Sequence, residues 1–259
     1  MRKTILPLFV LGCLSFTLPP LVKAGSKNVM ANASASVTEV ITSNSDNNAK
    51  EDAERNKAEK VKTASALLYD SLNLGKLGLS PVALQYAYKG YQYLLDKGAV
   101  PNSNILTVVD FSQSSRKKRL YILDVKNFKV LVNTYVSHGK NTGIDMAKKF
   151  SNIPESLQSS LGFYVTKNTY FGKHGLSLRL EGKERGFNDQ AEARAIVVHG
   201  ADYIGENRKN AAYMGRSFGC PAVPRAESDK VINTIKEGTT LFIYHPSASY
   251  LHGSKILNG

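Results

Sequence analysis

Cysteine is scarce in this sequence, which has two cysteines among 259 residues, Cys13 and Cys220. Cys13 lies inside a stretch with the features of an N-terminal export signal, so we expect Cys220 to be the only cysteine of the mature protein. An internal disulfide is then excluded. An exported protein with one unpaired cysteine has a buried structural thiol, an intermolecular disulfide or a reactive nucleophile.

Long apolar runs are also few. One runs from residue 5 to residue 18, between the basic pair Arg2-Lys3 and Val22-Lys23-Ala24, and predicts a signal peptide over residues 1–24. The run is shorter than the ~20 apolar residues that a membrane span needs. No later segment comes close, so we expect a soluble protein or one peripheral to the envelope. The alternative is a lipoprotein anchored through Cys13, with Val10-Leu11-Gly12-Cys13 as its cleavage box.

Acidic residues are outnumbered by basic ones. Residues 1–24 hold three of the 34 basic residues and none of the 21 acidic ones, which leaves a net charge of +10 on the mature chain. Such a charge suits an anionic polymer, for example a cell wall or a membrane surface. No run of Lys and Arg interleaved with aromatic residues indicates a nucleic-acid groove.

Composition divides the rest of the chain into three parts. Residues 25–60 are rich in Ser, Asn, Ala and Thr and then in mixed charge, which predicts a disordered linker. Residues 61–101 predict a helical N-terminal segment, with Ser80-Pro81 at the start of a helix that ends near Asp96. Residues 102–259 form the expected main folded domain.

Short β-segments dominate that last part. An amphipathic helix is expected only at 227–236. The remaining pattern predicts strands at 105–111, 119–125, 130–136, 163–166, 176–180, 195–198 and 240–244. The sequence therefore predicts a mainly β (α+β) fold behind a short helical segment.

The strand at 195–198 ends in His199-Gly200, and Ser217-Phe218-Gly219-Cys220 follows after a polar loop. A cysteine needs a base or a positive neighbour to become a thiolate near neutral pH, and His199 can supply both. Gly219 gives the backbone freedom to direct N–H groups at an oxyanion. We expect Tyr203, in the loop, to line the groove. The alternative for Cys220 is a buried inert thiol.

His199-Gly200, a loop and then Ser217-x-Gly219-Cys220 resemble the signature of the murein L,D-transpeptidase catalytic domain family. The likeness covers roughly residues 105–245 and includes the segments 135–139, 160–164, 172–175, 194–200 and 215–222. The resemblance implies a β-sandwich or barrel-like catalytic domain, a cysteine nucleophile with a histidine partner, and no metal or cofactor.

The resemblance also implies a substrate, the peptide stem of peptidoglycan. Cys220 would attack the carbonyl of the third stem residue, a diamino acid, and release the terminal D-alanine. Transfer of the thioester to an amine would give a 3-3 cross-link, and transfer to water would make the enzyme an L,D-carboxypeptidase. His199 would move the protons, Ser217 would orient the cysteine loop, and backbone N–H groups near Gly219 and Cys220 would hold the oxyanion.

The sequence departs from the family pattern at Phe218, where the motif usually has a second histidine. Because a phenyl ring donates no hydrogen bond, the substrate contacts must come from elsewhere. We expect His138 and His174, each beside a glycine, to compensate, and Arg216 to meet substrate carboxylates. Gly200 and Tyr203 complete the expected substrate-binding set.

Two other functions stay open at this stage. One is a catalytically silent module that binds or anchors to the wall, and the other is an unrelated cysteine peptidase or amidase. We expect export to the periplasm or cell envelope. The sequence does not indicate the acceptor of the acyl group or the oligomeric state.

Overall fold

The structure is a computed structural model that describes the backbone of residues 35–259 and the side chains of residues 51–259. Residues 51–259 form one compact unit, to which the helical stretch 35–50 does not belong. The expected signal peptide and Cys13 lie outside the described residues. No helix within residues 35–259 has the length and apolar character needed to cross a membrane.

Helix α1 spans Ala35–Ser71, so residues 35–60 of the expected linker are helical in the structure. Ala, Glu, Lys and Arg have high helix propensity, and charge pairs such as Glu59–Lys62, at 3.8 Å, lie on the same helix face. Residues 51–60 are exposed throughout. Residues 51–60 are therefore helical because of their intrinsic helix propensity and not because of packing. The prediction of disorder considered only their low hydrophobicity.

Eight strands form a single mixed sheet in the order β3-β2-β1-β8-β4-β5-β6-β7. Neighbours pair antiparallel, except β1 with β8 and β6 with β7, which are parallel. The prediction of a mainly β fold is confirmed. The strands are β1 Ile105–Asp110, β2 Leu120–Asp124, β3 Lys129–Thr134, β4 Gly162–Gly172, β5 Gly175–Gly182, β6 Val197–Ala201, β7 Ala222–Pro224 and β8 Thr240–Tyr244.

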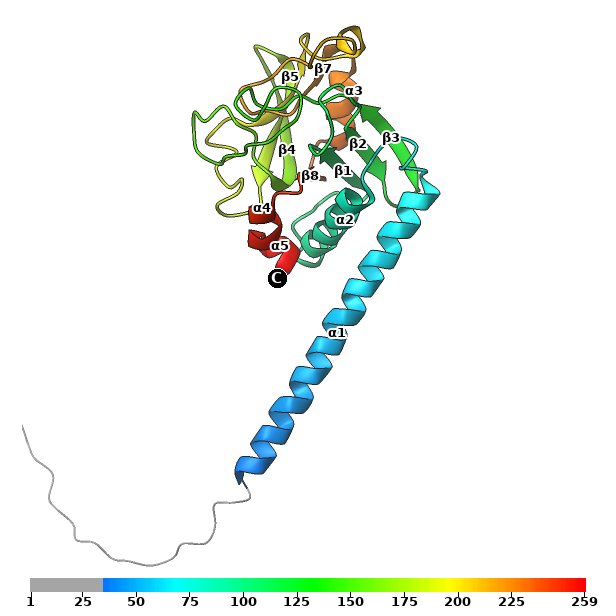
Figure 1. Cartoon of the computed structure of the whole chain (residues 1–259), viewed down its shortest axis with the longest axis vertical. Coiled ribbons are helices and arrows are strands. Elements are labelled where there is room, and N and C mark those ends of the chain that lie inside the picture. The colour runs from blue at the N-terminus through cyan, green and yellow to red at the C-terminus, as the bar shows by residue number, and fades with distance from the viewer. Residues whose placement is uncertain (1–34) are drawn as a thin grey trace, which may run out of the picture. The chain divides into compact units, whose positions relative to one another are not determined.

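Helix α2, Pro81–Asp96, packs against β1 and β8 beside the short C-terminal helices α4, Ala248–Gly253, and α5, Lys255–Asn258 (Figure 1). It begins as the sequence predicts, with Pro81 in its first turn and the Ala83 N–H donating to Ser80 Oγ at 3.4 Å. Gly90 allows the close approach to β4, because a Cβ there would lie 2.0 Å from the Phe163 ring.

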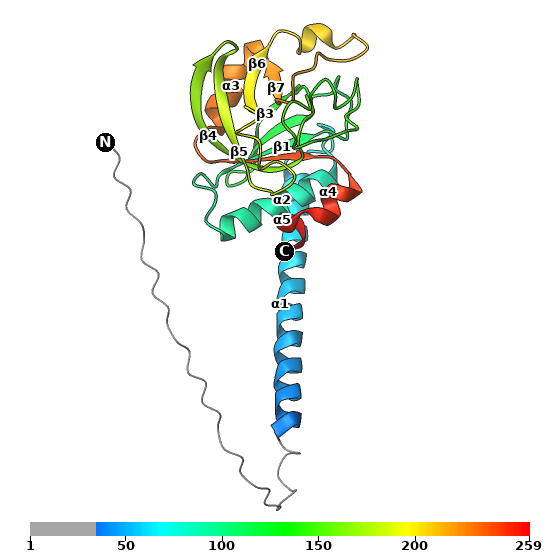
Figure 2. The ribbon, with the colours of Figure 1, turned by 90° about the vertical axis from the view of Figure 1, so that its left-hand side faces the viewer.

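Helix α3, Arg225–Ile235, covers β5, β6 and β7 (Figure 2). Its inward side chains include Val231, Ile232 and Ile235, the stripe expected from the sequence. A 3₁₀ turn, η1, spans Glu206–Arg208 in the loop between β6 and β7.

The register of three strands positions the candidate site. His199 of β6 lies opposite Ser177 of β5 on one side and opposite Ala222 of β7 on the other. Because β7 runs parallel to β6 and begins two residues after Cys220, the sheet brings the end of the cysteine loop to the strand that carries His199.

Candidate active site

A cavity of about 470 Å³ opens where β4, β5, β6 and the cysteine loop meet. Six of the nine site residues expected from the sequence line it, Ser217, Cys220, His174, His199, Tyr203 and Arg216. Its other lining residues are Tyr170, Gly172, Lys173, Ser177, Arg194, Ala195, Ile196, Val197 and Phe218. The remaining three expected residues, His138, Gly200 and Gly219, do not line the cavity.

The Cys220 thiol is half-buried and faces the cavity. Sγ accepts from the Val197 N–H at 3.5 Å and donates to the Ala195 carbonyl at 3.6 Å. Burial raises the thiol pKa above its ordinary value, while the Val197 N–H and the charge of Arg194 oppose that rise. Cys220 is therefore a protonated thiol at neutral pH that needs a base before it can attack.

His199 lines the same cavity and has the tautomer that such a base needs. Its ring is buried, and Nδ1 lies 3.1 Å from the Gly200 carbonyl oxygen. A carbonyl only accepts, so Nδ1 carries the proton and Nε2 keeps its lone pair. Burial lowers the pKa of His199, and the charges of His174, Arg225 and Lys173 lower it further. The imidazole is thus neutral at pH 7 and able to take a proton.

His174 lies in the turn between β4 and β5 and stacks on His199, with ring centroids 4.3 Å apart and an interplanar angle of 25°. Burial lowers the pKa of His174, and the charges of Lys173 and Arg225 act in the same direction. The stack fixes the face of the His199 ring. His174 therefore lines the cavity and is in direct contact with the ring of His199.

Ser217 holds the cysteine loop together. Its hydroxyl donates to the Cys220 carbonyl at 2.6 Å and accepts from the Gly219 N–H at 3.1 Å. Gly219 has φ +130°, and a Cβ there would lie 2.9 Å from the Gln158 carbonyl oxygen, so only glycine fits. Because the Gly219 N–H is already bonded to Ser217, it is not free for an oxyanion. The Cys220 N–H is the donor that the loop leaves beside Sγ.

Segment 137–140 clamps the same loop from behind. The Ser217 N–H donates to the His138 carbonyl at 3.0 Å, and the Lys140 N–H donates to the Ser217 carbonyl at 2.8 Å. Beyond the cysteine, the Ser137 N–H donates to the Ala222 carbonyl at 2.8 Å. Both ends of the cysteine loop are therefore tied to one segment.

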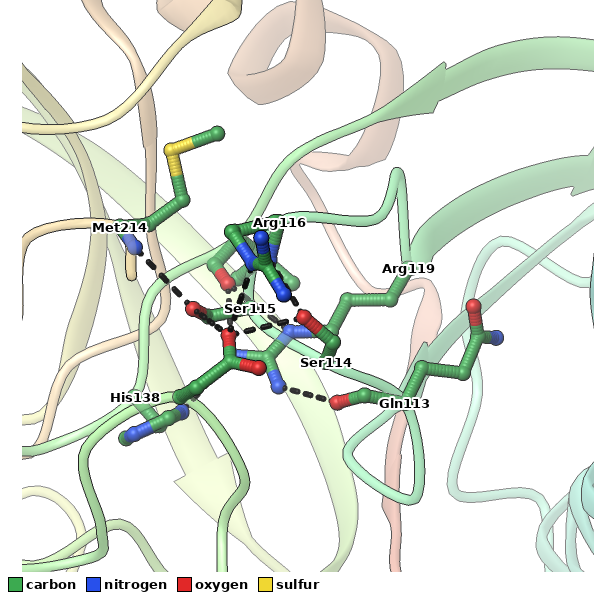
Figure 3. Close-up of polar contacts among 9 residues, drawn as sticks. Gln113, Ser114, Ser115, Arg116, Arg119, His138 and Met214 are labelled. Carbon is green, nitrogen blue, oxygen red and sulfur yellow. Dashed lines mark hydrogen bonds and ion pairs between the residues drawn. The ribbon is translucent and has the colours of Figure 1, made fainter. Parts of the chain in front are cut away.

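A buried polar cluster fixes that segment (Figure 3). The Arg119 guanidinium donates to the Val136 carbonyl and to His138 Nδ1, the latter at 2.8 Å. His138 Nε2 lies 3.2 Å from the Gly143 carbonyl, so Nε2 carries the proton. Figure 3 also shows Ser115, whose hydroxyl accepts from the Met214 N–H at 3.1 Å and so ties in the loop segment before the cysteine.

Two expected substrate contacts are corrected by this geometry. His138 is fully buried within the cluster and supports the loop from the side away from the cavity. Gly200 faces α3, where a Cβ would lie 2.6 Å from Ser228 Oγ. Successive residues of a strand point to opposite faces, so a β6 that turns His199 to the cavity must turn Gly200 to the helix.

Arg216 and Phe218 lie on the same rim of the cavity. Arg216 Nη1 donates to the carbonyls of Lys140 and Gly143, and its guanidinium lies 4.9 Å from the Tyr213 ring. The Phe218 ring is 67% exposed and lies 4.9 Å from Lys140 Nζ. The Phe218 side chain therefore points to solvent, and the hydrogen bonds within the cysteine loop do not involve it.

Sequence reasoning missed two cations of the cavity wall, Lys173 and Arg194. Arg194 donates to the carbonyls of Ser151 and Gln158 at 2.7 and 2.6 Å and so pins a loop beside the cysteine. A signal was present, because Arg194 stands just before the strand segment that carries His199. Lys173 precedes His174 in the turn between β4 and β5.

The buried His138 makes stability depend on pH. Burial, together with the charge of Arg119, lowers the pKa of His138 from 6.5 to about 4. Between these values the unfolded chain binds more protons than the folded one, so this contribution is complete above pH 6.5 and is lost as pH falls towards 4. The loss in free energy of unfolding amounts to about 3 kcal/mol.

Denaturant titrations between pH 4 and 7 measure this loss. His138→Gln can keep both hydrogen bonds but does not titrate, so its stability should fall less steeply over the same range. Parallel curves for the two proteins would contradict the assignment.

Comparison with known proteins places the chain in a family. Among solved structures, an L,D-transpeptidase from Mycobacterium smegmatis is similar over 55% of this chain and 59% of its own, with 13% identity and a TM-score of 0.34. One from Xylanimonas cellulosilytica is similar over 59% of this chain and 68% of its own, with 21% identity and a TM-score of 0.32. No curated protein matches the chain. The family model for the L,D-transpeptidase catalytic domain matches residues 76–244, about two thirds of the sequence. The chain belongs to the L,D-transpeptidase catalytic domain family.

Proposed function

We propose that this protein is a peptidoglycan L,D-transpeptidase that acts through a thioester on Cys220. The observation that carries the proposal is that Cys220 and His199 line one cavity, with the His199 proton fixed on Nδ1 and Nε2 left as a base. Family membership supports the reaction class, and the cationic cavity wall suits a peptide that ends in a carboxylate.

The first half-reaction begins with a proton transfer. His199 Nε2 takes the proton of Cys220 Sγ as the sulfur attacks the carbonyl carbon of the third stem residue. The carbonyl oxygen becomes an oxyanion, towards which the Cys220 N–H can donate. When the tetrahedral intermediate collapses, the C–N bond to D-alanine breaks and the imidazolium gives its proton to the leaving amine. A thioester remains on Sγ.

The second half-reaction reverses these roles. An amine of a neighbouring stem attacks the thioester carbonyl, and His199 takes the proton that this amine loses. The C–S bond breaks, and the imidazolium returns a proton to the sulfur. With an amine as acceptor the product is a 3-3 cross-link, and with water it is a shortened stem, as from an L,D-carboxypeptidase.

Several residues have supporting roles in this scheme. Ser217 and Gly219 hold the loop that presents Sγ, and His174 keeps the His199 ring in place by stacking. Tyr203 lines the cavity beside the substrate. We propose that the reaction takes place after export, in the periplasm or cell envelope, as residues 1–24 predict.

One observation favours the second candidate, a silent wall-binding module. Both hydrogen bonds of Sγ go to backbone atoms, Val197 N–H and the Ala195 carbonyl, rather than to His199. The silent module would keep the cavity and bind stems without acylation. An enzyme would instead rotate the thiol towards His199 when substrate enters.

Incubation of the protein with tetrapeptide stems decides between the two. Chromatography with mass spectrometry should detect free D-alanine together with either tripeptide stems or dimers linked through their third residues. Retention on sacculi with no D-alanine released over hours would refute the enzyme and favour the binding module. Dimers as the product would identify the acceptor as an amine, and tripeptide stems would identify it as water.

A further inference from the structure

The charged side chains that line the cavity are all cations. The charged residues are Lys173, Arg194 and Arg216, and neither Asp nor Glu is among the lining residues. Lys173 lies on the side of His174 and His199, while Arg216 lies beside Ser217 in the cysteine loop. The cavity that holds the Cys220 thiol is therefore lined by positive charge and by no negative charge.

Three cations outside the cavity wall are paired with carboxylates. Arg225, next to β7, lies 2.8 Å from Asp202. On the β4–β5 hairpin, Lys167 and Lys183 lie 3.2 and 2.8 Å from Glu181. By contrast, no carboxylate of residues 51–259 lies within 4.0 Å of the charged nitrogens of Lys173, Arg194 or Arg216. The three cations of the cavity wall are therefore not neutralised by any carboxylate of the described residues.

The cations also differ in how free they are to bind. Lys173 is exposed in the β4–β5 turn, and its Nζ has no hydrogen-bond partner among the described side chains and backbone. Arg216 is oriented by two carbonyls on Nη1, and the described residues offer no acceptor to Nε or Nη2. Arg194 is committed to the Ser151–Gln158 loop and adds fixed charge only.

We propose that Lys173 and Arg216 form a carboxylate subsite that selects acidic stems. The ligand class is a stem whose diamino acid keeps its free side-chain carboxylate, in preference to a stem in which that group is amidated or absent. The proposal rests on the function proposed above. An amide keeps the shape but loses the charge-assisted hydrogen bonds, which corresponds to a preference of about tenfold in kcat/KM.

The test compares two tetrapeptides that differ only in whether this carboxylate is free or amidated, with D-alanine release as the readout. The ratio of the two kcat/KM values cancels any change in catalysis that both stems share. We expect about a tenfold preference for the free acid, reduced at high salt, and its collapse towards one in Lys173→Gln and Arg216→Gln. Lys167→Gln, on the same hairpin but paired with Glu181, is the matched control and should keep the preference.

The outcomes separate this inference from the function beneath it. Equal kcat/KM for the two stems in the unmodified protein would overturn the subsite while leaving the transpeptidase intact. A preference that survives in both cavity variants would place the selection elsewhere and also overturn it. No D-alanine from either stem would refute the proposed function itself.

Discussion

Cys220→Ser is expected to lower the rate of D-alanine release at least about 10³-fold. A serine hydroxyl is far less acidic than a thiol, and the lowered pKa of His199 makes its imidazole a weaker base for the hydroxyl proton. Release of D-alanine under saturating stem concentrations is the measurement.

The fold should survive this change, which makes the result interpretable. Sγ makes only two long contacts, with Val197 and Ala195. The loop itself is held by Ser217 and the clamp of segment 137–140. Cys220→Ser should therefore unfold at nearly the same denaturant concentration as the unmodified protein. A variant that folds normally and still releases D-alanine at the original rate would exclude Cys220 as the nucleophile.

His199→Gln is expected to lower kcat by about 10²–10⁴-fold with a smaller change in KM. Glutamine can occupy the ring position but cannot take a proton from the thiol. The same substitution should slow alkylation of Cys220 at pH 7. Because the thiol ionises without help above its raised pKa, the alkylation rates of the two proteins should converge at high pH.

His252→Gln is the matched control, since His252 is an exposed histidine in α4, outside the cavity wall. It should leave kcat and the alkylation rate unchanged. If His199→Gln shifts stability but leaves the pH dependence of alkylation as it was, His199 is a structural residue and the base lies elsewhere.

Strands were predictable where the sequence has apolar, β-branched runs. The segment 240–244 coincides with β8, and 105–111 with β1 to within one residue. The three-residue β7 was not predictable, because it exists only through its pairing with β6. In the same way, α4 and α5 depend on contacts with α2 and with each other.

The motif residues of the site were predictable from the sequence, whereas the buried residues that support them and the full cavity wall were not. Cys220 and His199 could be paired because strand ends present side chains, and β6 does so. That His138 would be buried against Arg119 could not be foreseen, since Arg119 lies just before β2, 19 residues earlier in the sequence. Lys173 became visible only when the cavity wall was assembled, whereas the position of Arg194 just before the His199 strand was a signal in the sequence.

Phe218 is less disruptive than the motif alone suggests. Its side chain is exposed, while the internal bonds of the loop come from the Ser217 hydroxyl and the Gly219 N–H. The loop conformation thus does not depend on the side chain at position 218. The side chain at position 218 can instead alter the shape and polarity of the cavity rim that the substrate contacts.

Intact-protein mass spectrometry after brief mixing with a tetrapeptide stem tests the central claim most directly. The account predicts a mass increase equal to the stem without its D-alanine, located on Cys220 by peptide mapping, absent in Cys220→Ser and lost when an acceptor amine is added. D-alanine release with no adduct on Cys220 at any mixing time, or an adduct on another residue, would contradict it.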